Sequence, residues 1–203
     1  MTQESTSPVI KENINGHHVI FEPIEHTYYV DGVKMKSVSE ICKLEHPFMY
    51  QGIDDSILKI AALRGTNLHK EIEEFELNGA LSYSPEFTNY LNIKSKIGFK
   101  KELTETMVII EHQGKVICAG RFDLLASIGN QTALIDFKRT SQVHLSYVTL
   151  QLNLYRIGLI QSYGKQIDQL LMIRLKNYES DIVKIPIDES YVNSVLKKHN
   201  NIG

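Results

Sequence analysis

The chain has 203 residues, of which 42% are hydrophobic and 23% charged, and its formal net charge is −2. This length and composition suit a globular domain with a substantial core, and the sequence contains no low-complexity tract. No apolar run is long enough to cross a membrane, and the near-neutral charge argues against a broadly basic nucleic-acid binder.

The polar segment 1–16 is expected to be a disordered N-terminal tail, and residues 17–203 are expected to form a single domain. The first residues lack the basic and apolar regions of a secretory signal. Cys42 and Cys118 lie far apart in apolar surroundings, which predicts buried thiols in a reducing compartment. The expected location is therefore the cytoplasm, or the host cytoplasm if a phage encodes the chain.

A hairpin and a helix are the first elements predicted along the chain. Alternating residues flank Asp31-Gly32, a dipeptide that favours the tight turn between two antiparallel strands. Ser37 or Ser39 is then a suitable N-cap for a helix that ends near Pro47.

Two further helices are predicted over about 53–63 and 66–77, and the second carries a candidate functional histidine. Thr66 is its expected N-cap, and His69 lies beside the apolar stripe of this helix. A histidine in such a place usually packs at the edge of a core, so the pattern alone assigns it no function. Another helix is expected to begin at Ser84-Pro85.

Three strands are predicted between about 101 and 138, and two of them contain acidic residues within apolar runs. Asp123 lies in the second strand, and Asp136 follows thirteen positions later in the third. If the strands pair through the turn at 128–131, the two carboxylates converge, and Lys138 points the same way as Asp136. Buried carboxylates are costly unless they are paired or hold a cation. A lone Asp-x-Lys is more often a surface ion pair, but two acids and a lysine also suit metal-assisted hydrolysis.

A long helix predicted over 146–162 is apolar on nearly all sides, so it should lie between the sheet and another layer. Gln151 and Tyr155 are four residues apart on it and therefore share a face. A tyrosine near such a stripe often only packs. Strands over about 166–175 and 181–186 and a C-terminal helix capped by Asp188 complete the predicted elements.

Taken together, Gly120-x-x-Asp123, Asp136-x-Lys138, Gln151-x-x-x-Tyr155 and Gly65-x-x-x-His69 resemble the PD-(D/E)xK nuclease superfamily. Within it, the motifs are most similar to those of RecB-type and phage recombination exonucleases. The resemblance covers roughly residues 19–176. It implies an α/β fold with a restriction-endonuclease-like core, in which a central mixed β-sheet is flanked by helices.

The resemblance also implies roles for particular residues. Asp123, Asp136, His69 and the backbone carbonyl of Phe137 would hold Mg²⁺, for which Mn²⁺ would substitute. Lys138 would position the attacking water and stabilise developing charge.

Three further residues of the site are implied by the same family. Gln151 and Tyr155 would orient the lysine or the substrate. Glu105, near the start of the first core strand, would add a further acid, although Glu102 and Glu111 compete with it. Two cysteines exclude the four-cysteine iron–sulfur cluster of some relatives.

The implied function is a metal-dependent exonuclease that degrades double-stranded DNA from its ends in phage or bacterial recombination or repair. A homo-oligomer and a single-strand annealing protein partner are expected, and no membrane. A lysine cluster (Lys94, Lys96, Lys100 and Lys101) is a candidate phosphate contact, although such clusters are usually only solvated. The alternatives are a structure-specific endonuclease such as a resolvase or nickase, a non-catalytic DNA-binding relative, or an interaction protein with an incidental match.

Overall fold

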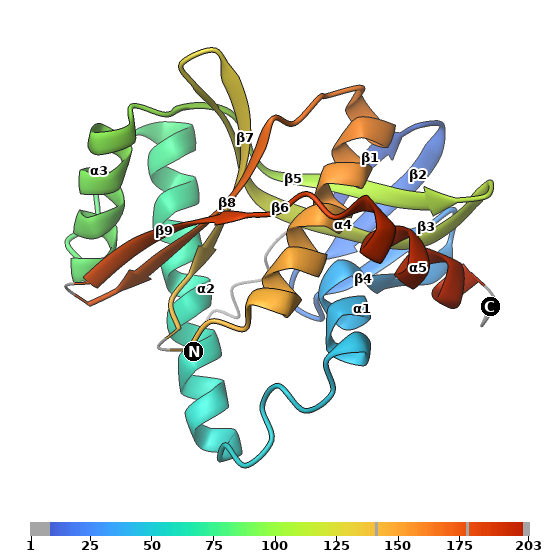
Figure 1. Ribbon diagram of the computed structural model, residues 1–203, viewed down its shortest axis with the longest axis horizontal. Helices are drawn as coiled ribbons and strands as arrows, with labels where there is room; N and C mark the ends of the chain where they lie inside the picture. Colours follow the sequence, from blue (N-terminus) through green and yellow to red (C-terminus); the bar gives the residue numbers. More distant parts are fainter. Residues whose placement is uncertain (1–8, 141, 178, 201–203) are drawn as a thin grey trace, which may run out of the picture.

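A computed structural model describes residues 9–140, 142–177 and 179–200 (Figure 1). In chain order, the elements are β1 (Ile10–Ile14), β2 (His17–Glu22), β3 (Thr27–Val30), β4 (Val33–Ser37), α1 (Val38–Glu45), α2 (Asp55–Asn78), α3 (Pro85–Ile97), β5 (Lys100–His112), β6 (Lys115–Ile128), β7 (Gln131–Lys138), α4 (Leu145–Tyr163), β8 (Gln169–Lys176), β9 (Glu179–Ile185) and α5 (Glu189–Asn200).

The strands form one mixed sheet in the order β1-β2-β3-β4-β6-β7-β8-β9, and β5 pairs with β6 beside this path. The β4–β6 and β7–β8 pairs are parallel, while the other pairs are antiparallel. Helices α1, α4 and α5 cover one face, and α2 and α3 cover the other (Figure 1). The expected α/β class, with a central mixed sheet flanked by helices, is confirmed.

Side-chain alternation along the central strands separates the two cores. Leu125 and Leu134 pack with α1, α4 and α5, whereas their neighbours Leu124 and Ile135 pack with α2 and α3. Because successive residues of a strand point to opposite faces, continuous apolar runs bury both faces of the sheet. The acidic residues of β6 and β7 therefore lie in a low-dielectric layer.

Two sequence expectations about the first half of the chain are corrected. Residues 10–14, expected in a disordered tail, form β1 against β2, because Ile14 is buried with the hairpin core; residues 1–8 of that tail lie outside the described part. The predicted helices 53–63 and 66–77 are one helix, α2, which is capped by Asp54. Thr66 therefore lies inside a helix, because Gly65 weakens it without breaking it.

Other local predictions are confirmed. Asp31 and Gly32 adopt left-handed backbone conformations in the turn between β3 and β4, with φ of 51° and 79°. Ser37 caps α1 in a capping box with Glu40. Cys42 and Cys118 are buried free thiols.

Helix α4 occupies the centre of the helical layer, as its apolar composition predicts. Its residues pack against the sheet on one side and against α1 and α5 on the other. Within the described ranges, no helix combines the length and the apolar character that crossing a membrane requires.

Candidate metal centre and active site

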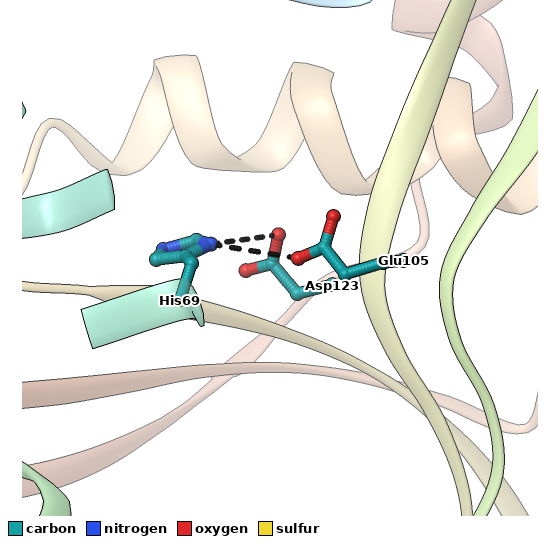
Figure 2. Close-up of side chains that lie close together, drawn as sticks. All are labelled: His69, Glu105 and Asp123. Atoms are coloured by element: carbon teal, nitrogen blue, oxygen red, sulfur yellow. Dashed lines mark ion pairs between the residues drawn. The ribbon is translucent and has the colours of Figure 1, made fainter. Parts of the chain in front are cut away.

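Three potential metal ligands come together from three elements of the fold (Figure 2). His69 comes from α2, Glu105 from β5 and Asp123 from β6, and one ligand atom of each lies within 4.8 Å of the others. Nδ1 of His69 is 3.3 Å from Oδ1 of Asp123 and 3.9 Å from Oε1 of Glu105. An imidazole with two carboxylates is a donor set suited to a divalent cation.

Asp123 is positioned where the pairing of β6 with β7 ends. The ladder between these strands runs from Ile128–Gln131 to Leu124–Ile135. Beyond it, Oδ2 of Asp123 accepts a hydrogen bond of 2.7 Å from the backbone N–H of Phe137. The carboxylate thus takes the place of a strand partner, which fixes one of its oxygens and orients the other towards His69.

Glu105 lies inside β5 rather than near its start, where the sequence placed it. Its φ of 45° is in the left-handed region, which is uncommon for a residue other than glycine. Ladder pairs flank it at Thr104 and Thr106, and Arg121 holds it through a 2.9 Å hydrogen bond to its carbonyl and a 3.4 Å ion pair. Backbone strain of this kind gathers at functional sites.

The competing acids are engaged elsewhere. Glu102 pairs with Lys165, and Glu111 bonds His17. Of these three glutamates, Glu105 is therefore the one that lies beside Asp123.

Asp136 and Lys138 lie side by side on β7, next to the three-residue group. Nζ of Lys138 donates hydrogen bonds of 2.8 Å to Oδ1 of Asp136 and 3.0 Å to Oε1 of Gln151. Asp136 is 3% exposed, and its Oδ2 is buried without a hydrogen-bond partner among the described residues. A buried carboxylate oxygen is rarely left unpaired, so this atom fits a site built for a cation.

Nε2 of His69 donates to the backbone carbonyl of Phe137 at 3.0 Å. This bond fixes the tautomer and leaves Nδ1 facing the carboxylates. Glu73, one helical turn after His69 on α2, pairs with Arg121 rather than with the imidazole.

Burial shifts the pKa values of the carboxylates in this group, and their neighbours modify each shift. Burial, reinforced by the charge of Asp123, raises the pKa of Glu105 to about 8. Burial also raises the pKa of Asp136 to about 6, although Lys138 opposes this shift. Burial disfavours the charge on Asp123, but His69 outweighs it and lowers the pKa of Asp123. Glu105 and Asp136 thus take up protons more readily than isolated carboxylates, whereas Asp123 does so less readily. A bound cation would offset the buried negative charge in the way that a proton does.

Tyr155 lies against the backbone of β6. A Cβ atom at Gly120 would be 2.8 Å from Cε1 of Tyr155 and 3.0 Å from Cγ2 of Val38, so the motif glycine admits the ring. Burial raises the pKa of Tyr155 well above its usual value, and the charges of Asp123 and other neighbours add to this. The phenol is therefore neutral at physiological pH.

Replacing Gly120 by alanine is expected to lower the melting temperature and the activity together, because the new methyl group overlaps the buried ring of Tyr155. Thermal unfolding and the rate of DNA cleavage measure the two effects. Gly65→Ala is the matched control, since its added methyl meets open space and favours the helix. Equal stability of the two variants would contradict the packing role of Gly120.

The basic residues near the motifs are largely engaged in ion pairs. Arg121 pairs with Glu73 and Glu105, Arg139 with Glu86, and Arg156 with Glu189. In the predicted lysine cluster, Lys94 and Lys101 both bond Glu76. The sequence motifs assigned no role to Arg121, which holds Glu105, and its place two residues before Asp123 was the available signal.

Comparisons with known proteins identify no family. No family model matches the chain, and no curated protein matches it. Among solved structures, the crystal structure of SSO0001 has 18% sequence identity, a TM-score of 0.45 and coverage of 83% of this chain and 76% of that one. An alkaline exonuclease (LHK-Exo) from Laribacter hongkongensis has 10% identity, a TM-score of 0.45 and coverage of 82% and 84%. Likenesses at this level carry no argument about the activity of this chain.

Proposed function

We propose that this chain is a metal-dependent nuclease of the PD-(D/E)xK superfamily that hydrolyses DNA phosphodiester bonds. The observation that carries the proposal is the convergence of His69, Glu105 and Asp123 beside the Asp136–Lys138 pair. Oδ2 of Asp136, which has no hydrogen-bond partner in the described part of the chain, supports it, because burying an unpaired carboxylate oxygen costs free energy that a cation would offset.

His69, Glu105 and Asp123 would hold the metal, and Asp136 and the carbonyl of Phe137 are the adjacent donors. Mg²⁺ is the proposed ion, with Mn²⁺ as a substitute. A bound divalent cation supplies an activated water and offsets the negative charge of the phosphate.

The chain itself supplies a fixed positive charge. Burial alone would lower the pKa of Lys138, but the charges of Asp136 and Asp123 raise it, so the ammonium is retained at neutral pH. The hydrogen bonds to Asp136 and Gln151 hold this ammonium in place. A preorganised charge of this kind stabilises the negative charge that develops on a phosphate during hydrolysis.

We further propose that the enzyme acts from DNA ends. The net charge of −2 and the ion pairs of the arginines near the site imply weak affinity for internal duplex, because that affinity scales with the phosphates neutralised. An oligomer that encircles its substrate would compensate for weak binding. A single-strand annealing protein is the proposed partner for the product.

Linear DNA labelled at one end is therefore expected to shorten progressively in Mg²⁺, while a relaxed closed circle of the same sequence survives. Gel analysis of both substrates in one reaction makes the comparison, and a reaction in EDTA is the control. Circles that are cut as fast as linear molecules would favour a structure-specific endonuclease. Absence of metal-dependent cleavage of any DNA would contradict the nuclease proposal itself.

A further inference from the structure

The connection between α1 and α2, residues 46–54, presents two aromatic side chains to solvent. Phe48 is 76% exposed and Tyr50 is 46% exposed. Met49, between them, is partly buried and packs against the core formed with α1 and α4, so it fixes the segment to the domain. Backbone hydrogen bonds from Met49 to His46 and from Gln51 to Phe48 give the segment a defined turn structure.

This aromatic segment lies close to the candidate active site. The ring of Tyr50 meets that of His144 edge-on, with centroids 6.5 Å apart. His144 directly precedes α4, and Gln151 on that helix accepts a hydrogen bond from Lys138. In the sequence, His144 lies six residues after Lys138. In Figure 1 the connection runs along the lower side of the molecule, the side on which β7 ends and α4 begins.

A second ring contact gives the same placement. The ring of His46, at the start of the connection, lies 6.1 Å from that of Tyr147 on α4, measured between centroids. His46 and Tyr50 therefore hold the connection against the first turn of the helix that carries Gln151.

We propose that Phe48 and Tyr50 form a stacking platform for unpaired bases adjacent to the phosphate that Lys138 contacts. Aromatic side chains bind nucleic acid by stacking on base faces, and this contact tolerates any sequence. In a duplex, neighbouring base pairs cover those faces, so stacking on the platform requires a single strand or a frayed end. The inference rests on the proposed nuclease function and specifies that the strand enters the site unpaired.

A second copy of the chain is the competing occupant of this surface. Ile57, Ile60 and Leu63 in the first half of α2 are exposed next to the connection and would suit a protein contact. The aromatic pair is favoured as a DNA contact because Tyr50 lies at the start of α4, the helix whose Gln151 bonds Lys138, and because flat rings match base faces. The oligomeric state of the variants distinguishes the two occupants.

The test uses oligonucleotides that carry 2-aminopurine at the terminal position, either single-stranded or in a blunt duplex. In EDTA, where cleavage is prevented, binding of the single strand by the parent is expected to quench the fluorescence of the base. In Phe48→Ala/Tyr50→Ala the quench should disappear and the dissociation constant should rise about tenfold or more. Tyr50→Phe, which keeps a ring, should behave like the parent.

Tyr83→Ala is the matched control, because Tyr83 is 95% exposed in the connection between α2 and α3. In Mg²⁺, the double variant should raise KM for single strands while retaining most of kcat. If the parent cleaves DNA and the double variant quenches the base as the parent does, the platform is overturned and the nuclease proposal stays intact. A change in oligomeric state without an effect on the base would assign the surface to a second copy. A parent that quenches the base but cleaves nothing would instead contradict the nuclease function.

Discussion

Asp123→Asn and Asp136→Asn are expected to abolish metal-dependent DNA cleavage while the fold is retained. Asparagine keeps the shape of each side chain and an oxygen that can accept from the N–H of Phe137 or from Lys138. The substitution removes the negative charge that would balance the positive charge of the metal ion. The loss of activity should exceed the roughly 10–100-fold typical of residues that only support a ligand.

Calorimetry with Mn²⁺ separates the ligands from their neighbours. Binding is expected to be lost in Asp123→Asn and Glu105→Gln, whose oxygens lie with His69 in the three-residue group. Asp136→Asn reports whether the unpaired Oδ2 is also a ligand, since in that case its Mn²⁺ affinity falls as well.

The parent protein should also unfold at higher temperature in Mn²⁺, because a cation bound to the native state stabilises it by mass action. Glu189→Gln is the control, since Glu189 is an exposed acid that pairs with Arg156 on the surface. Parent-like Mn²⁺ binding in both Asp123→Asn and Glu105→Gln would show that the metal assignment is wrong.

Lys138→Ala is expected to lower turnover by roughly two to three orders of magnitude, the usual scale for loss of a preorganised electrostatic stabiliser. DNA affinity should change much less, because contacts to other phosphates carry most of it. Single-turnover rates and equilibrium binding in EDTA measure the two quantities separately.

A matched control for this variant is Lys165→Ala, which removes an ammonium that pairs with Glu102 on the surface. Gln151→Leu should give a smaller decrease in turnover, since it loosens Lys138 without removing its charge. If Lys138→Ala weakens DNA binding and leaves turnover unchanged, Lys138 acts in substrate binding rather than in the chemical step.

Local patterns in the sequence were sufficient to place together the three candidate site residues of β6 and β7. Asp123, Asp136 and Lys138 lie on strands that are joined by a short turn, so alternation and antiparallel pairing place them together. The face shared by Gln151 and Tyr155 follows from helical periodicity in the same way. Ser37, Asp188 and the Asp31-Gly32 turn were likewise predictable, because caps and tight turns depend on neighbours in sequence.

Only the tertiary structure decided which other groups complete the site. Glu105 is distinguished from Glu102 and Glu111 by a left-handed backbone conformation inside β5, and no local propensity predicts that conformation. Arg121 donates a hydrogen bond to the carbonyl of Glu105, and His69 donates one to the carbonyl of Phe137. Both bonds join residues that are far apart in the sequence. The contact of His69 depends on how α2 packs across the sheet, which is determined by burial over the whole domain rather than by residue spacing.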